Sequence, residues 1–161
     1  MLFRSQRVDV QSALDMHAAV KAQLSQADVF ISTAAVADWR PAAVATQKIK
    51  KDATGQMPAL AWAENPDILA EAAATERARN GELFCVGFAA ESHDLLAHTQ
   101  AKRERKQVPL MVGNIGSQTF GADDNALLLV DAKGAVEWPR APKTELAERL
   151  MAEIASRLPR H

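Results

Sequence analysis

Short apolar runs alternate with segments of helical character along this chain, and that alternation restricts its fold more than any other feature. The apolar runs, which we expect to form strands, are residues 8–10, 29–33, 83–88, 110–112 and 126–130. The segments expected to form helices, from apolar spacing or capping residues, are residues 12–24, 65–79 and 92–106. Strands that alternate with helices predict a mostly parallel sheet with right-handed crossovers.

The end of the chain departs from this alternation. Residues 131–134 have the composition of a hairpin turn and lead into residues 136–138, which predicts an antiparallel edge to the sheet. Residues 143–158 predict an amphipathic helix, and residues 44–62 predict a hairpin-like arm that protrudes from the sheet. No repeat or linker divides the 161 residues. We therefore expect one domain, residues 1–161, with an α/β, Rossmann-like three-layer fold.

Composition excludes several classes of protein. A net charge of -1 argues against a general nucleic-acid binder, so we expect no nucleic-acid partner. No apolar stretch approaches the roughly 20 residues of a membrane-spanning helix, so we expect no membrane partner and a cytoplasmic location. Cys85 is the one cysteine and lies within an apolar run, which favours a buried structural thiol over a nucleophile.

The histidines offer no metal-ligand or catalytic-triad spacing. The four of them are His17, His93, His98 and His161. Each is read as an isolated surface histidine, so a zinc site or a serine hydrolase is not expected, and the sequence assigns no metal ligand.

The clearest candidate site follows the strand expected at residues 29–33. Ligands bind open α/β sheets beyond the carboxyl ends of the strands, and small residues there let a ligand approach the backbone. An acid can accept hydrogen bonds from ribose or base, and lysines can neutralise phosphates. The residues with these properties are Ser32, Thr33, Ala34, Asp38 and the basic cluster Lys48-Ile49-Lys50-Lys51. A core strand followed by a solvated lysine loop is the alternative interpretation.

Other polar clusters can be assigned to a site or to the surface. Lys102 and Lys106 are four residues apart, so they share one face of the expected helix, where they either bind phosphate or form a solvated helix end. Asn65-Pro66-Asp67 predicts a helix start with Asn65 as the N-cap. Asn114 precedes a polar loop that is either a substrate rim or only a turn.

Six segments, taken in order and spacing, resemble the bacterial phosphopantothenate-cysteine ligase family. The resemblance covers residues 7–157. The segments are Phe30-Ile31-Ser32-Thr33-Ala34-Ala35-Val36-Ala37-Asp38-Trp39, Lys48-Ile49-Lys50-Lys51, Asn65-Pro66-Asp67-Ile68-Leu69, Val86-Gly87-Phe88-Ala89-Ala90-Glu91, Lys102-Arg103-Glu104-Arg105-Lys106 and residues 120–125.

The resemblance implies a CTP-dependent ligation with Mg²⁺ in coenzyme A biosynthesis. The carboxylate of 4'-phosphopantothenate would attack the α-phosphate of CTP, releasing pyrophosphate and leaving an acyl-cytidylate. The amine of cysteine would then displace CMP to form an amide. The resemblance further implies a homodimer, for which the arm at residues 44–62 is our candidate contact, and a decarboxylase domain that is usually fused upstream.

Carried over onto this sequence, the family's functional positions fall on the candidate site. Lys48 is the expected catalytic residue, and Asn114 is the expected contact to the acyl substrate. The CTP contacts implied by the resemblance are Ser32, Thr33, Ala34, Asp38, Lys48, Pro66, Asp67, Ile68, Leu69, Phe88, Lys102 and Lys106.

The sequence departs from the family pattern in ways that keep a second function open. The family's first two strands, with a Ser-Ser-Gly phosphate loop and a functional Asn, have no counterpart, so the chain is expected to begin near the third family strand. Pro109 and Ile115 stand where the family has aspartates. A nucleotide-binding and dimerisation module without catalysis is therefore the alternative. An oxidoreductase would need a glycine-rich turn after the first strand, which the sequence lacks.

Overall fold

The structure of the chain is a computed structural model that describes residues 5–43, 60–119 and 121–159. Its centre is a five-stranded sheet in the order β1-β4-β5-β6-β7. The strands are β1 (Val29–Ser32), β4 (Phe84–Glu91), β5 (Leu110–Ile115), β6 (Asp124–Asp131) and β7 (Gly134–Pro142). β1, β4 and β5 pair in parallel, whereas β6 and β7 form an antiparallel hairpin at the edge. The predicted α/β sheet with its edge hairpin is confirmed.

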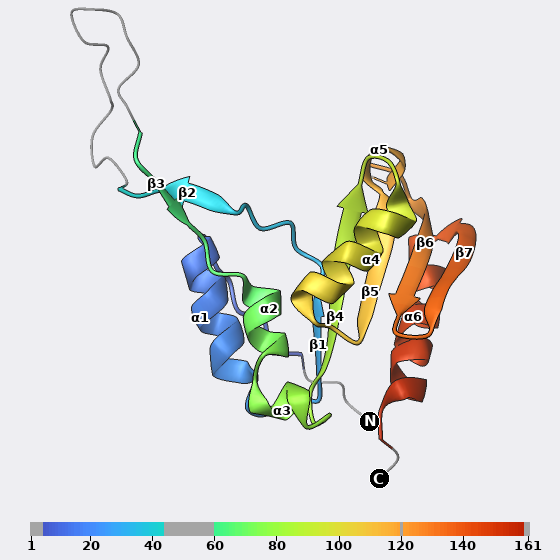
Figure 1. Cartoon of the computed structure of the whole chain (residues 1–161), viewed down its shortest axis with the longest axis horizontal. Coiled ribbons are helices and arrows are strands. Elements are labelled where there is room, and N and C mark those ends of the chain that lie inside the picture. The colour runs from blue at the N-terminus through green and yellow to red at the C-terminus, as the bar shows by residue number, and fades with distance from the viewer. Residues whose placement is uncertain (1–4, 44–59, 120, 160–161) are drawn as a thin grey trace, which may run out of the picture.

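Helices cover both faces of this sheet and make the predicted three layers (Figure 1). One face carries α2 (Ile68–Ala73) and α4 (Leu95–Lys106), and α1 (Ala13–Gln23) and α3 (Glu76–Arg79) pack against α2. The other face carries α6 (Lys143–Arg157), and the short α5 (Gly116–Thr119) follows β5. Among the described residues, no helix is both long enough and apolar enough to cross a bilayer.

Each face of the sheet has its own apolar core. On the side of α2, Leu69 and Ala72 pack with Cys85 and Met111 from the strands. On the opposite side, the predicted apolar stripe of α6 packs against the sheet through Leu146, Leu150 and Ile154. Cys85 is fully buried, and this burial raises the pKa of its thiol to about 11. The prediction of a structural thiol is therefore confirmed.

Two glycines set how closely the helices approach the sheet. A Cβ atom on Gly87 of β4 would lie 2.6 Å from Cδ2 of Leu69 in α2. A Cβ atom on Gly113 of β5 would clash with the hydroxyl of Thr99 in α4. Because both strands lack a side chain at these points, α2 and α4 lie directly on the backbone of the sheet.

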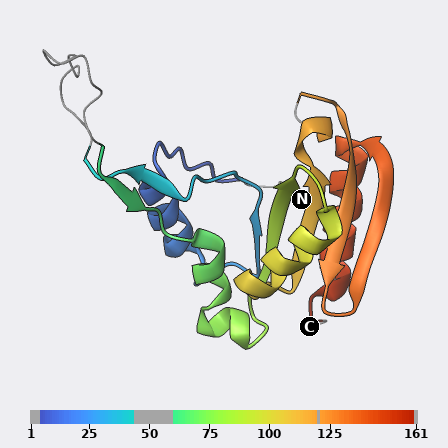
Figure 2. The ribbon, with the colours of Figure 1, turned by 45° about the horizontal axis from the view of Figure 1, so that its top comes forward.

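A two-stranded ribbon stands apart from the main sheet (Figure 2). β2 (Trp39–Pro41) pairs antiparallel with β3 (Trp62–Glu64), and Pro41 lies opposite Trp62. This pairing forms the base of the predicted arm. Residues 44–59, which would form the rest of the arm and include Lys48, lie outside the described residues.

Three sequence predictions about local structure are wrong. Residues 8–10 form no strand. Val8 is exposed, and the strand that pairs with β1 is β4. The helix expected at residues 65–79 is two helices, since the hydroxyl of Thr75 accepts a hydrogen bond from the N–H of Ala78 and starts α3. The first of these helices is capped by Asp67 instead of Asn65.

Candidate nucleotide site

The loop that follows β1 is tied to the residues that precede α2. Ser32 ends β1 opposite Gly87, and the following residues to Asp38 lie mostly at the surface. The backbone N–H of Asn65 donates to the carbonyl of Asp38 at 2.8 Å, and its side-chain amide donates to the carbonyl of Ala37 at 2.8 Å. These two bonds explain why Asn65 does not cap the helix. They bring the predicted contacts of β1 beside those at the start of α2.

Asp67 connects the start of α2 to the end of α4. Its carboxylate accepts a hydrogen bond from the N–H of Ala70 at 3.1 Å and forms an ion pair with Lys106. Partial burial acts to raise the pKa of Asp67. The hydrogen bonds from Lys106 and Ala70, with the charges of Lys106 and Arg105, outweigh burial and hold this pKa below its usual value. Asp67 is therefore ionised at neutral pH and holds the Lys106 ammonium at the helix start.

Lys102 lies one turn before Lys106 on α4 and pairs with a different element. Its Nζ is 2.7 Å from Oε1 of Glu91, the last residue of β4. The Glu91 side chain is only 12% exposed, whereas that of Lys102 is 38% exposed. Lys102 and Lys106 lie one turn apart on the same face of α4, as predicted. Lys106 reaches the start of α2, and Lys102 reaches the end of β4. Together they place one positive charge at the carboxyl end of β4 and another at the start of α2.

The structure brings some of the remaining predicted residues to this region and turns others away. The side chains of Ile68 and Leu69 are buried in the core, so they can offer a ligand only their backbone. Pro66 is half-buried beside them. Phe88 packs with the core on the α6 side, on the face of the sheet opposite α2 and α4. Asn114 is buried near the end of β5, where it lies opposite Ala90.

Sequence reasoning missed the partners of these lysines. Glu91 closes a motif that carries the family resemblance, yet its pairing with Lys102 depends on the packing of α4 against β4. An acid at the end of a buried strand, followed by a helix with a basic face, is the signal that would have identified it. The sequence predicts Asn65 as a helix N-cap, whereas in the structure its side chain joins the loop before α2 to the loop after β1.

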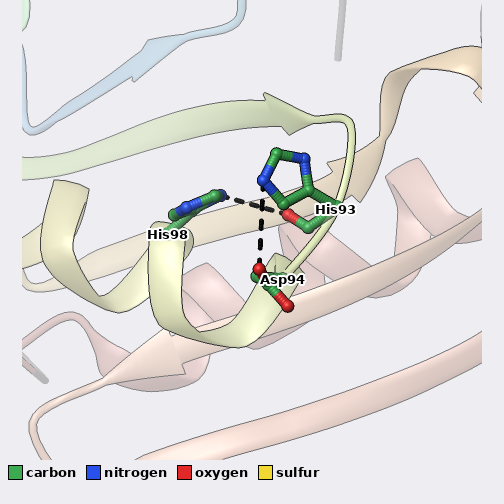
Figure 3. A group of neighbouring side chains, drawn as sticks. All are labelled: His93, Asp94 and His98. Carbon is green, nitrogen blue, oxygen red and sulfur yellow. Dashed lines mark hydrogen bonds and ion pairs between the residues drawn. The ribbon is translucent and has the colours of Figure 1, made fainter.

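The interpretation of His93 and His98 as isolated is also wrong. With Asp94 they form a cluster at the start of α4, shown in Figure 3, in which one ligand atom from each side chain lies within 4.8 Å of the others. Of the described residues, this is the one group of three or more His, Cys, Asp and Glu side chains with such spacing. His17 is remote from it and pairs with Glu71.

Comparisons with known proteins agree with this fold. The family model described as the DNA/pantothenate metabolism flavoprotein C-terminal domain matches residues 3–158. The coenzyme A biosynthesis bifunctional protein CoaBC of Vibrio cholerae is 40% identical over 148 residues, which are 90% of this chain and 36% of that protein. The Escherichia coli K12 protein of the same name is 43% identical over 155 residues, which are 94% of this chain and 37% of that protein. The chain thus spans little more than a third of these relatives.

Solved structures show the same architecture. The crystal structure of the C-terminal domain of CoaBC superimposes with a TM-score of 0.70 at 27% identity, covering 91% of this chain and 63% of that one. A mutant of Cab2 in complex with phosphopantothenate-cysteine superimposes with a TM-score of 0.65 at 17% identity, covering 91% of this chain and 53% of that one.

Proposed function

This chain belongs to the family of the DNA/pantothenate metabolism flavoprotein C-terminal domain, and from that membership we propose that it acts in coenzyme A biosynthesis as a CTP-dependent phosphopantothenate-cysteine ligase. The names of the related bifunctional proteins support the pathway. The Cab2 complex, in which a protein of similar fold holds phosphopantothenate-cysteine, supports the product.

One structural observation carries the proposal: Lys102 and Lys106 lie one turn apart on α4, the first held at the carboxyl end of β4 and the second at the start of α2. Within the described residues, each lysine has one carboxylate partner, Glu91 for Lys102 and Asp67 for Lys106. Partly exposed ion pairs of this kind contribute about 1 kcal/mol or less. Exchanging the Asp67 carboxylate, which is 45% exposed, for a phosphate oxygen therefore costs little, whereas Lys102 can donate to phosphate only while it keeps its mostly buried partner Glu91. We propose that both lysines bind the phosphates of CTP.

The reaction that these charges would serve has two steps. A carboxylate oxygen of 4'-phosphopantothenate attacks the α-phosphorus of CTP, and the bond to pyrophosphate breaks. The amine of cysteine then attacks the acyl carbon, CMP leaves with the electron pair, and the amine loses a proton as the amide forms. Fixed positive charge stabilises the negative charge that develops on the transferring phosphate and on pyrophosphate.

Asp38 is the residue in this region that fits a role toward Mg²⁺ or ribose. It is exposed, and no side chain in the described part of the chain pairs with its carboxylate. Mg²⁺ is commonly held by one or two carboxylates together with the phosphates of the substrate, so a single free carboxylate fits such a site. A cation bound there would offset phosphate charge, while Asp38 would hold the nucleotide in place.

Lys48 remains our candidate for the catalytic residue. We predict that Lys48→Gln lowers the rate of ligation by about 100-fold, the cost of removing one charged donor from a transition state. Thermal stability should stay the same, because the lysine is assigned to chemistry and not to packing. A large loss of thermal stability in this variant would contradict the assignment.

The partners of the site are part of the same proposal. We propose 4'-phosphopantothenate and cysteine as substrates, with Asn114 and its surroundings on the acyl side. A homodimer that contacts through the arm, a decarboxylase domain fused upstream and a cytoplasmic location complete it. Sedimentation of the purified chain tests the dimer.

The direct test is to incubate the chain with CTP, Mg²⁺, 4'-phosphopantothenate and cysteine, and to follow pyrophosphate, CMP and the amide product by mass. We expect all three products with CTP and much less with ATP. Pyrophosphate without CMP would place the block at the second step. Binding of CTP without any product would support the alternative, a nucleotide-binding and dimerisation module. If the chain neither binds CTP nor forms any product, the proposal is overturned.

A further inference from the structure

The segment between β4 and α4 gathers two imidazoles and a carboxylate at one point on the surface. His93 and Asp94 lie just before α4, and His98 lies on its first turn. Nε2 of His93 is 3.9 Å from Oδ2 of Asp94, and the rings of His93 and His98 meet edge to face with centroids 5.0 Å apart (Figure 3). Three side chains with metal-ligating atoms therefore converge outside the candidate nucleotide site.

The backbone makes this convergence possible. Asp94 adopts a left-handed conformation with φ of 46°, which an Asp tolerates better than most residues. It occupies the N-cap position of α4, yet its side chain makes no capping hydrogen bond. Its carboxylate is thus directed to the histidines instead of to the helix, which is unusual for an Asp at this position.

The hydrogen bond at His93 suits metal ligation, whereas the one at His98 has to be replaced by the cation. Nδ1 of His93 is 2.8 Å from the hydroxyl of Ser92, so a proton on Nδ1 leaves the Nε2 lone pair facing Asp94. A ligating histidine commonly donates its other ring N–H to an oxygen in this way. Nδ1 of His98 faces the cluster, 3.1 Å from the carbonyl of His93 and 3.6 Å from Oε2 of Glu91. Because the carbonyl of His93 can only accept, Nδ1 of His98 carries the proton in this hydrogen bond, and ligation through Nδ1 requires that proton to move to Nε2 and the cation to replace the bond.

We propose that His93, Asp94 and His98 bind a divalent transition-metal cation of the Zn²⁺ class. Two imidazoles favour Zn²⁺, Co²⁺ or Ni²⁺, whereas Mg²⁺ prefers oxygen ligands. Zinc holds nitrogen ligands at about 2.0–2.1 Å, so the present spacing closes onto a cation through small side-chain rotations. The buried carboxylate of Glu91 adds negative charge beside His98. Three protein ligands leave a fourth position for water or an exogenous ligand.

This site does not depend on the proposed ligase function. Its ligands are imidazole nitrogens and a carboxylate, whereas the candidate nucleotide site is lined by lysine ammonium groups. The two are nevertheless neighbours, because Glu91 lies between His98 and Lys102. The test is therefore a binding measurement that requires neither CTP nor turnover.

The full chain is titrated with Co²⁺, whose visible absorption reports nitrogen ligation, and the bound Co²⁺ is then competed with Zn²⁺ and with Mg²⁺. We expect one saturable site that Zn²⁺ displaces and Mg²⁺ does not. Each of His93→Asn and His98→Asn should lower the affinity by about tenfold or more, and Asp94→Asn by a similar factor.

His17→Asn is the matched control, because His17 also faces a carboxylate, Glu71 at 2.7 Å, but belongs to no cluster of metal-ligating side chains among the described residues. The affinity of the His17→Asn variant for Co²⁺ should match that of the unchanged chain within about twofold. Thermal melts without metal check that every variant is folded. Absence of saturable Co²⁺ binding, or binding that survives His93→Asn and His98→Asn, would overturn the site.

Discussion

The two faces of the sheet are both covered by packed helices and carry ion pairs, but the ion pairs differ in how many carboxylates each basic side chain contacts. On one face, α2 and α4 rest on the glycine positions of β4 and β5, and each lysine of α4 pairs with one carboxylate of the described residues, which is exposed at Asp67 and mostly buried at Glu91. On the other face, α6 buries Leu146, Leu150 and Ile154, and its end is held by an arginine. The first arrangement includes a lysine whose exposed partner a ligand can replace, whereas in the second the arginine is shared between two carboxylates.

The arginine at the end of α6 shows what a closed ion-pair cluster looks like. Arg157 donates to Asp131 of β6 at 2.7 Å and to Glu153 of its own helix at 2.8 Å. Burial acts first to raise the pKa of Asp131, but the hydrogen bond from Arg157 and further bonds and charge hold it below its usual value. A planar guanidinium that satisfies two carboxylates has little left to give a ligand. A lysine with one partner exchanges it more readily.

The largest effect on stability should come from filling the contact between α2 and β4. Gly87→Val places a side chain where Leu69 already lies, so we expect the free energy of unfolding to fall by about 2–3 kcal/mol. For a domain of this size that loss lowers the melting temperature by roughly 4–12 °C. Thermal unfolding measures it.

Ala90→Val is the control for that substitution, because Ala90 lies on the same strand but is exposed. We expect its stability to change by no more than about 0.5 kcal/mol. Equal losses in the two variants would show that the strand, and not the close approach of α2, sets the effect.

A smaller difference should separate the two kinds of ion pair. Arg157→Met removes two charge-assisted hydrogen bonds and should cost about 1–2 kcal/mol, discounted for the solvent at its partners. Lys106→Met removes one pair with a partner that is 45% exposed, and should cost less than 1 kcal/mol. Urea unfolding of both variants measures the difference. A larger loss in Lys106→Met would mean that this lysine is structural.

The smallest effect concerns acid. The pKa of Asp67 and the pKa of Asp131 are both lowered in the folded chain. A carboxylate of this kind contributes stability that is complete above its ordinary pKa of 3.8 and is lost as the pH falls through the lowered folded value. Asp67→Asn and Asp131→Asn should therefore lose less stability than the unchanged chain between neutral pH and pH values below 3.8.

Melting temperatures across that range test the acid effect, with Asp123→Asn, at an exposed position, as control. The control should follow the unchanged chain. If Asp67→Asn follows it as well, the ion pair with Lys106 does not hold in solution.

Local patterns made parts of this fold predictable. The stripe of α6 follows from apolar residues at helical spacing, and the shared face of Lys102 and Lys106 follows from their separation by four residues. Their partners could not be predicted in the same way, since Asp67 is 39 residues from Lys106 and meets it only when α2 packs on Gly87.

The histidine cluster shows a different limit of sequence reasoning. His93 and His98 are five residues apart, a spacing that places two side chains on different faces of a continuous helix. In the structure α4 begins between them, and the left-handed turn at Asp94 returns His93 toward His98. A spacing argument that assumed one regular helix could not find the cluster. The prediction of a strand at residues 8–10 was wrong because a short apolar run forms a strand only when another strand pairs with it, and the local sequence does not show that partner.

The affinity for CTP of a variant that carries both Lys102→Gln and Lys106→Gln, measured beside Arg157→Met, shows whether the lysines of α4 bind nucleotide phosphate. We expect the double variant to lose at least tenfold in affinity, about 1.4 kcal/mol or more. Arg157→Met should bind CTP like the unchanged chain despite its lower stability. Unchanged CTP affinity in the folded double variant would show that these lysines do not bind the nucleotide.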